Sequence, residues 1–177
     1  MTPVELAPAL AAFRARLARS ASATRCLAEW CAERGIGTGP VRSLRRAPLP
    51  DAPDLAALLG MQGGMRHRSV TLMRGEVALS DCDVWWLEAR LGPGMAAALE
   101  ETDLPFGQVV APLAPVRRTV LDRTADAPHA LEVRAVLEAE GRPLAVVREF
   151  YRAALFAGGE GNVSPLHPPQ PSVPPGN

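Results

Sequence analysis

Two stretches late in the chain alternate apolar and polar residues, and a turn joins them. From Ala130 to Ala139, one side of the alternation carries Leu131, Val133, Ala135 and Leu137. A period of two residues is typical of a strand that buries one face. The run 140–143 (Glu-Gly-Arg-Pro) supplies turn residues, and Leu144 to Ala153 returns as the partner strand. The chain must therefore accommodate an antiparallel hairpin.

The rest of the sequence favours an α+β fold with an antiparallel sheet. Apolar residues recur at helical spacing in the first 20 residues, where Thr2 to Glu5 fits a capping box, and a second helix is predicted over Thr24–Arg34. Further strands are predicted over 41–47, 65–74, 77–87 and 116–121, with helical turns at 54–59 and 95–101. Hairpin spacing dominates and βαβ alternation is absent, so we expect the N-terminal helices to cover one face of the sheet.

The composition changes from Gly158 onward. Six prolines follow within a few residues, a pattern typical of a disordered, polyproline-leaning tail. We therefore expect a single domain over residues 1–157 and a disordered Pro-rich tail over 158–177. The hydrophobic fraction of 47% supports a globular chain of this length.

Charge and cysteine usage exclude several classes of function. The formal net charge is zero, which argues against a nucleic-acid binder driven by bulk electrostatics. No stretch approaches 18 apolar residues, so no membrane span is expected, and no signal peptide is evident. Three cysteines make no complete disulfide set, and the Cys26–Cys31 spacing matches no zinc motif. A reduced, cytoplasmic and monomeric protein is the expectation.

Arg68 is the first candidate site residue. The alternation of the strand 65–74 places it on one face with Val70 and Leu72. A buried arginine needs an anionic partner, because an unpaired buried charge is very costly. The partner can be the carboxylate of a ligand or of the protein itself, and a half-exposed arginine is the third alternative.

Glu149 is the second candidate. It shares a strand face with Ala145, Val147 and Tyr151. A carboxylate in such a place favours a raised pKa or a tight cationic partner. A solvated glutamate on a lightly buried face is the alternative.

The strand 77–87 carries two different faces. Cys82 lies with Ala78, Ser80 and Val84 on the small, apolar face, which we assign inward. The opposite face carries Leu79, Asp81 and Asp83, together with Val77, Trp85 and Leu87.

Four segments, taken together, resemble chorismate pyruvate-lyase. They are Arg-Ser-Val-Thr-Leu at 68–72 followed by Gly-Glu at 75–76, Leu-Pro-Phe-Gly at 104–107, and Gly-Arg-Pro-Leu at 141–144 running on to Glu-Phe at 149–150. Order and spacing both agree over about residues 22–156. The same fold occurs in the effector-binding domains of bacterial transcription regulators.

The resemblance implies a six-stranded antiparallel sheet and a ligand enclosed beneath helical flaps. It also implies removal of pyruvate from chorismate to leave 4-hydroxybenzoate, with no metal and no cofactor. By position, Arg68 matches the arginine that binds the ring carboxylate, and Glu149 matches the glutamate that meets the ring hydroxyl. Phe106 matches the residue whose backbone touches the ligand. Arg68 and Glu149 are thus the implied catalytic residues, and they bind substrate together with Phe106.

The sequence also departs from that family. Ala23 stands where the family has a ligand-contacting methionine, and Cys82 stands where it usually has an arginine. Trp85 and Trp86 are unlike the lyase as well. These changes bear on the substrate and on whether catalysis occurs.

Two rival functions remain open. The first is a non-catalytic domain of the same fold that binds an aromatic or anionic metabolite. The residues before Val41 are too few for a winged-helix DNA-binding segment, which counts against a complete regulator. The second rival is an interaction protein that uses its Pro-rich tail.

Overall fold

The computed structural model describes residues 3–47, 57–58, 60 and 65–157. Its helices are α1 (Pro3–Ala18), α2 (Ala23–Glu33), α4 (Met95–Glu101) and α5 (Phe106–Val109). Its strands are β1 (Val41–Arg45), β2 (Met65–Arg74), β3 (Val77–Leu87), β4 (Val116–Thr124), β5 (His129–Ala139) and β6 (Arg142–Arg152). The expected capping box at Thr2, most of the helical turn at 54–59 and the tail 158–177 lie outside the described residues.

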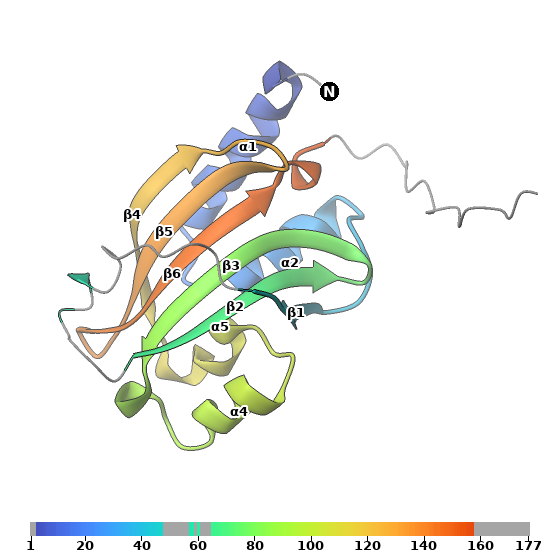
Figure 1. Cartoon of the computed structure of the whole chain (residues 1–177). Coiled ribbons are helices and arrows are strands. Elements are labelled where there is room, and N and C mark those ends of the chain that lie inside the picture. Colours follow the sequence, from blue (N-terminus) through green and yellow to red (C-terminus); the bar gives the residue numbers. More distant parts are fainter. Residues whose placement is uncertain (1–2, 48–56, 59, 61–64, 158–177) are drawn as a thin grey trace, which may run out of the picture.

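The strands form one antiparallel sheet in the order β1-β2-β3-β6-β5-β4. The hairpins β2–β3 and β5–β6 meet at its centre, where β3 pairs with β6. Figure 1 shows α1 and α2 against one face of the sheet, with α4 and α5 at one end. The expected α+β fold, with six antiparallel strands and the N-terminal helices on one face, is confirmed.

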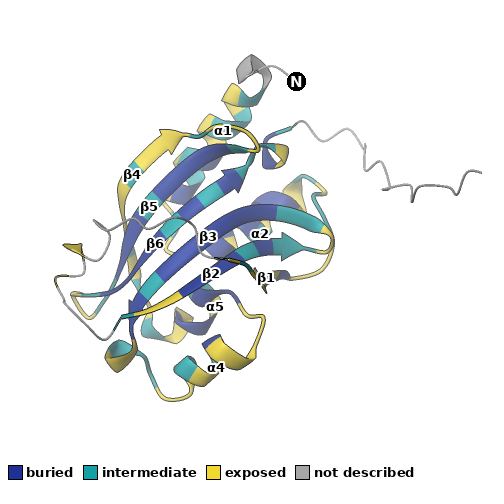
Figure 2. Cartoon of the chain, viewed as in Figure 1, coloured by how far each residue is buried: buried dark blue, intermediate teal, exposed yellow. Residues whose placement is uncertain are grey.

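Aromatic side chains hold the two N-terminal helices on the sheet. The ring of Phe13 on α1 contacts Trp30 on α2 and Tyr151 on β6, with centroids 5.1 and 5.0 Å apart. Trp30 Nε1 donates a hydrogen bond of 3.0 Å to the carbonyl oxygen of Leu155, so its one polar atom is satisfied. Most residues of β3 and β5 are buried, as Figure 2 shows, so the face of these strands opposite the helices is also largely covered.

Three local expectations were wrong. The sequence 103–107 predicts a loop, but α5 begins within it at Phe106, because Pro105 is extended and its carbonyl oxygen accepts from the amides of Gln108 and Val109. The strand expected over 116–121 continues to Thr124. Leu79 was assigned to the outward face of β3, but it is fully buried in the core. Leu72 pairs with Ser80 and Met73 with Ala78, so Leu79 is an extra, bulged residue of β3, and the bulge turns its side chain into the core.

The sheet face away from α1 and α2 carries three buried carboxylates. Asp81 accepts hydrogen bonds from Thr71, His129 and Arg152, each at 2.7 Å. Burial raises the pKa of Asp81, but these hydrogen bonds outweigh it and the net pKa lies below the usual value.

Glu132 on β5 is 1% exposed, as is Asp83 on β3, the third of these carboxylates. It accepts hydrogen bonds from Arg123 at 2.7 Å, Arg134 at 2.9 Å and Arg148 at 3.1 Å. Burial raises its pKa, but the three guanidinium groups outweigh burial and the net pKa lies below the usual value. The charge of Glu132 therefore ties together three strands of the sheet.

We predict that Glu132→Gln lowers the free energy of unfolding by about 2 kcal/mol at pH 7. Removing one partner of a buried pair costs about 3–5 kcal/mol, and the partial exposure of the arginines reduces that figure. The pKa of Glu132 is lower in the folded protein than in the unfolded one. The carboxylate therefore contributes its full stabilisation at pH values above the unfolded pKa, and this stabilisation is lost as the pH falls through the folded pKa. Urea unfolding at pH 7 and pH 3 should show the difference between wild type and variant shrinking in acid.

The matched control is Glu138→Gln on the same strand. Glu138 pairs with Arg118 at the surface, where an ion pair is worth about 0–1 kcal/mol. Equal losses in the two variants would contradict the role of Glu132.

Candidate functional site

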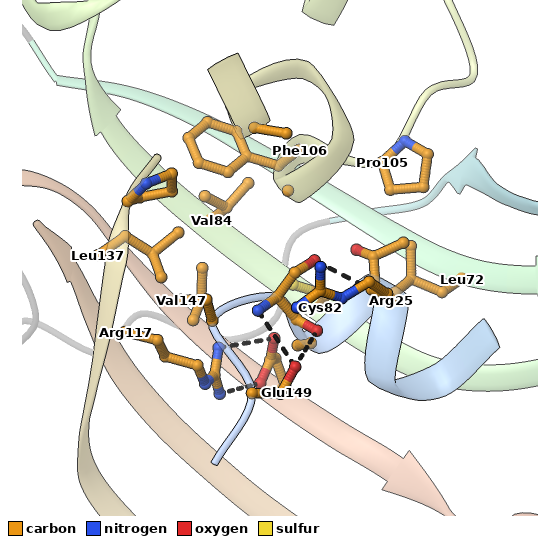
Figure 3. Close-up of a pocket in the computed structure, with 18 of the residues that line it drawn as sticks. Arg25, Leu72, Cys82, Val84, Pro105, Phe106, Arg117, Leu137, Val147 and Glu149 are labelled. Atoms are coloured by element: carbon orange, nitrogen blue, oxygen red, sulfur yellow. Dashed lines mark hydrogen bonds and ion pairs between the residues drawn. The ribbon is translucent and has the colours of Figure 1, made fainter. Parts of the chain in front are cut away.

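A cavity of about 530 Å³ lies between the sheet and the helices. The turn from α1 into α2, the start of α5 and the start of β4 form its walls around the inner faces of β2, β3 and β6. Its apolar lining includes Val70, Leu72, Val84, Phe106, Leu137 and Val147, several of which are labelled in Figure 3. A pocket of this size and lining is suited to a small organic ligand.

Arg68 lines this cavity and is 4% exposed. Its guanidinium donates to the carbonyl oxygens of Leu104 at 3.2 Å and Thr102 at 3.1 Å, and its Nε is buried without a partner. Among the described residues, no carboxylate forms an ion pair with it. Burial lowers the pKa of Arg68 because the charged form loses hydration. Carbonyl dipoles do not neutralise a charge, and Asp103 acts on Arg68 only from beyond ion-pair distance, so the described part of the cavity wall holds a cation without an ion pair.

The segment 99–104, which we call the carbonyl-bound segment, is held in place through its backbone. Arg45 donates to the carbonyl oxygens of Leu99 at 3.1 Å and Glu100 at 2.8 Å. The amide of Ser43 donates to the carbonyl oxygen of Asp103 at 2.7 Å. With the two contacts of Arg68, these bonds fix the path of the chain from α4 into α5, and so the position of the cavity wall at Phe106.

Glu149 lines the same cavity from β6 and is 6% exposed. Arg117 on β4 grips it with two bonds, Nη2 to Oε2 at 2.5 Å and Nη1 to Oε1 at 3.3 Å. The Tyr151 hydroxyl donates to Oε2 at 2.9 Å. Figure 3 shows the guanidinium of Arg117 beside the carboxylate of Glu149, with dashed lines joining the two. The sequence left open a raised pKa, a tight cationic partner or a solvated glutamate at position 149, and the structure shows the tight cationic partner.

Arg117 is the site residue that sequence reasoning missed. Its side chain is 3% exposed. Burial lowers its pKa, but the neighbouring charge of Glu149 outweighs burial and the net pKa is raised. The sequence offered only one indication, an arginine two residues before Thr119 on the inner side of β4. The sequence of an edge strand does not show which residues of other strands its side chains will contact.

The cavity brings the expected site residues together. Arg68 pairs in register with Val84, and Val84 pairs with Val147. Glu149 therefore lies two strands across and two residues along from Arg68, a Cα separation of roughly 12 Å from standard sheet spacings. Phe106 lines the cavity as well, and so does Ala23 at the start of α2.

Cys82 faces the cavity between Val70 and Glu149 in the register of the sheet, and its thiol is free and buried. The inward assignment is confirmed. Burial raises the pKa of the thiol well above its usual value.

We predict that a thiol reagent at pH 8 labels Cys82 at least about tenfold more slowly in the native protein than in denaturant, since only the thiolate reacts. Peptide mapping by mass spectrometry separates Cys82 from Cys26 and Cys31. Rapid native labelling of Cys82 would contradict both its burial and the face assignment.

The sheet order and the helices beside the cavity define the fold to which the chain is similar, a chorismate-lyase-like α+β fold. A solved structure similar to it is PhnF from Mycobacterium smegmatis, with a TM-score of 0.55 and 16% identity over 82% of this chain and 70% of that chain. The effector domain of PhnF, solved separately, aligns with a TM-score of 0.43 and 18% identity over 63% of this chain and 80% of that chain. At such identities the likeness shows the fold alone.

One curated relative was found by sequence. The protein named "Uncharacterized protein y4mC" of Sinorhizobium fredii (strain NBRC 101917 / NGR234) is 33% identical over 116 residues, 62% of this chain and 49% of its own length. The chain thus spans about half the length of the curated relative it matches. No family model matches the sequence. Within the described part of the chain, no helix is long and apolar enough to cross a membrane.

Proposed function

We propose that the chain is a small-molecule-binding domain whose ligand is an organic anion with an apolar body. The observation that supports this most directly is the charge of Arg68, which is buried in the cavity wall without a carboxylate partner among the described residues. Arginine presents five N–H donors in a planar fork that matches a carboxylate, and two of them are used by carbonyl groups. A ligand carboxylate would supply the missing negative charge.

The other charges of the cavity support an anionic ligand. Its charged lining residues are Arg19, Arg25, Arg68, Arg117 and Glu149. Because Arg117 and Glu149 neutralise each other, the remaining charge of the lining is positive. A low-dielectric cavity strengthens the attraction of such a lining for an anion. The apolar surfaces of β3, β6 and α5 would bury the rest of the ligand.

Binding accounts for the site better than lyase chemistry does. A lyase of the resembled family would use Glu149 to meet a hydroxyl of the substrate and to help move its proton. Here Oε2 of that carboxylate already accepts hydrogen bonds from both Arg117 and Tyr151, so these two side chains occupy the oxygen that a substrate hydroxyl would have to reach. The likeness of the fold to PhnF, whose separately solved effector domain is named as such, agrees with a binding domain.

Calorimetric titration with benzoate and 4-hydroxybenzoate tests the proposal, with benzamide as the matched neutral probe. We expect the carboxylates to bind at least about tenfold more tightly than benzamide, since a charge-assisted pair is worth about 1.5–3 kcal/mol. Equal affinities, or no binding by any carboxylate at millimolar concentration, would overturn it. Incubation with chorismate should release no pyruvate, and catalytic release would instead establish the lyase function.

A further inference from the structure

We propose that ligands enter the cavity through a mouth between the turn that joins α1 to α2 and the stretch that leads into β4, and that two arginines on its rim, Arg19 and Arg25, attract the anion and set the rate of association. Arg68, inside the cavity, then sets the rate of release. This inference rests on the proposed function, because it concerns how the same ligand reaches Arg68.

The exposure of the lining residues locates the mouth. The lining residues on the strands of the sheet floor are buried, as is Phe106 at the start of α5. The exposed lining residues come from two stretches, Ala18, Arg19, Ala21 and Arg25 on one side and Ala111, Ala114 and Val116 on the other. A cavity exchanges its contents with solvent where its wall is exposed. The mouth therefore lies between these two stretches, which we call the basic rim (residues 18–25) and the apolar rim (residues 111–116).

The basic rim carries two positive charges. The Arg25 side chain is 67% exposed, and its Nε lies 3.9 Å from Glu29, a surface contact that contributes little. Arg19 is exposed as well. The one carboxylate among the lining residues is Glu149, whose charge Arg117 already neutralises. The potential at the mouth is therefore positive, and it attracts anions over a distance that the ionic strength sets.

The two rims suit the two parts of the proposed ligand. The apolar rim presents small aliphatic side chains, and Val116 is 64% exposed. An anion with an apolar body can place its charge against the basic rim and its body against the apolar rim. The rim arginines are hydrated and hold the anion weakly, whereas Arg68 is 4% exposed and acts in a lower dielectric. The rim thus accelerates entry without retaining the ligand.

Fluorine NMR line shapes of 4-fluorobenzoate, titrated with the protein, give both rate constants. We expect the variant Arg19→Gln, Arg25→Gln to lower the association rate constant about fivefold at an ionic strength of about 0.01 M, with the dissociation rate constant changed less than about twofold. At about 0.5 M the loss of association rate should shrink below about twofold, because salt screens exposed charges. A variant that instead releases the ligand faster would overturn the inference, because the rim would then bind the ligand in its final position.

Two controls isolate the position of the charges. The variant Arg66→Gln, Arg142→Gln loses the same charge from exposed residues that do not line the cavity, so its association rate constant should stay within about twofold of wild type. The neutral probe 4-fluorobenzamide should enter at a rate that neither salt nor the rim substitutions change. Equal slowing by the two double variants would contradict the role of the rim.

A cysteine placed on the apolar rim tests the route itself. The native cysteines are buried and free, so brief treatment with a bulky maleimide should modify Ala111→Cys first. We expect the attached group to slow association and dissociation alike, at least about tenfold, since it obstructs the mouth. The same label on Ala15→Cys, an exposed residue of α1 outside the lining, should change neither rate. Unchanged rates in labelled Ala111→Cys would place the entrance elsewhere.

The same measurements separate this inference from the proposed function. If 4-fluorobenzoate binds and its rates do not respond to the rim, the mouth is wrong and the anion site stands. If 4-fluorobenzoate does not bind the wild-type protein at millimolar concentration, the proposed function itself fails.

Discussion

Gly37→Ala will lower the free energy of unfolding by about 4 kcal/mol. Gly37 has φ of +62°, a region that costs other residues about 1–2 kcal/mol. A methyl group there would also lie 2.2 Å from the carbonyl oxygen of Arg74, which is backbone and cannot rotate away. Forcing the two segments apart adds about 1–3 kcal/mol, as overpacking generally does.

Gly35→Ala is the matched control for this prediction. Gly35 has φ of +65°, but an added methyl group there would meet nothing within 4 Å. This variant should lose only about 1–2 kcal/mol in urea unfolding, which is the cost of the backbone conformation. If both alanine variants lose the same free energy of unfolding, the close approach of the turn to β2 is not the reason that position 37 requires glycine. The contact matters for the site because β2 carries Arg68.

Arg68→Met will weaken the binding of a carboxylate ligand about 100-fold, equivalent to about 2.8 kcal/mol. Methionine keeps part of the length and the apolar stem, but it removes the charge and the donors of the guanidinium. Truncating one partner of a buried, hydrogen-bonded charge pair typically costs about 2–5 kcal/mol. Calorimetric titration of wild type and variant with the same carboxylate measures the effect.

Arg45→Met separates binding from support of the cavity wall. Arg45 holds the carbonyl-bound segment at Leu99 and Glu100, but it does not line the cavity. Its loss should reduce stability by about 1 kcal/mol while the affinity changes by less than about threefold. If Arg45→Met weakens binding as much as Arg68→Met does, then Arg68 acts by holding the segment and does not bind the ligand.

Local patterns were sufficient to predict most of the fold. The bounds of β3 and α4 match the expected ones, because two-residue and helical periodicities are local properties of the sequence. The hairpin turns at 75 and 141 use glycines with positive φ, as their sequences indicate. The bulge that turns Leu79 inward was not predictable, because the sequence of a strand carries no pattern that indicates a one-residue shift in its pairing with a neighbour.

The candidate site was predictable only in part, for reasons of distance along the chain. Arg68 and Glu149 were singled out because each is a charge on an apolar strand face, and both line the cavity. Their partners were not visible. Arg117 reaches Glu149 from an edge strand separated from β6 by β5, and the sheet order that allows this is a property of the whole fold. The burial of Glu132 depends likewise on arginines from three strands.

The carbonyl-bound segment has a consequence for how this domain can diverge. Every amino acid contributes the same backbone carbonyl group. The bonds from Arg45, Arg68 and Ser43 to these carbonyls therefore fix the path of the chain whatever side chains those residues carry. The side chains of Glu101, Asp103 and Leu104 are exposed, and they can therefore change in size and charge while the wall behind them keeps its position, whereas the Thr102 hydroxyl bonds the backbone on both sides of it. Homologues that differ freely at these three residues could share one cavity shape, and a library randomised there would vary the rim of the domain without reshaping its interior.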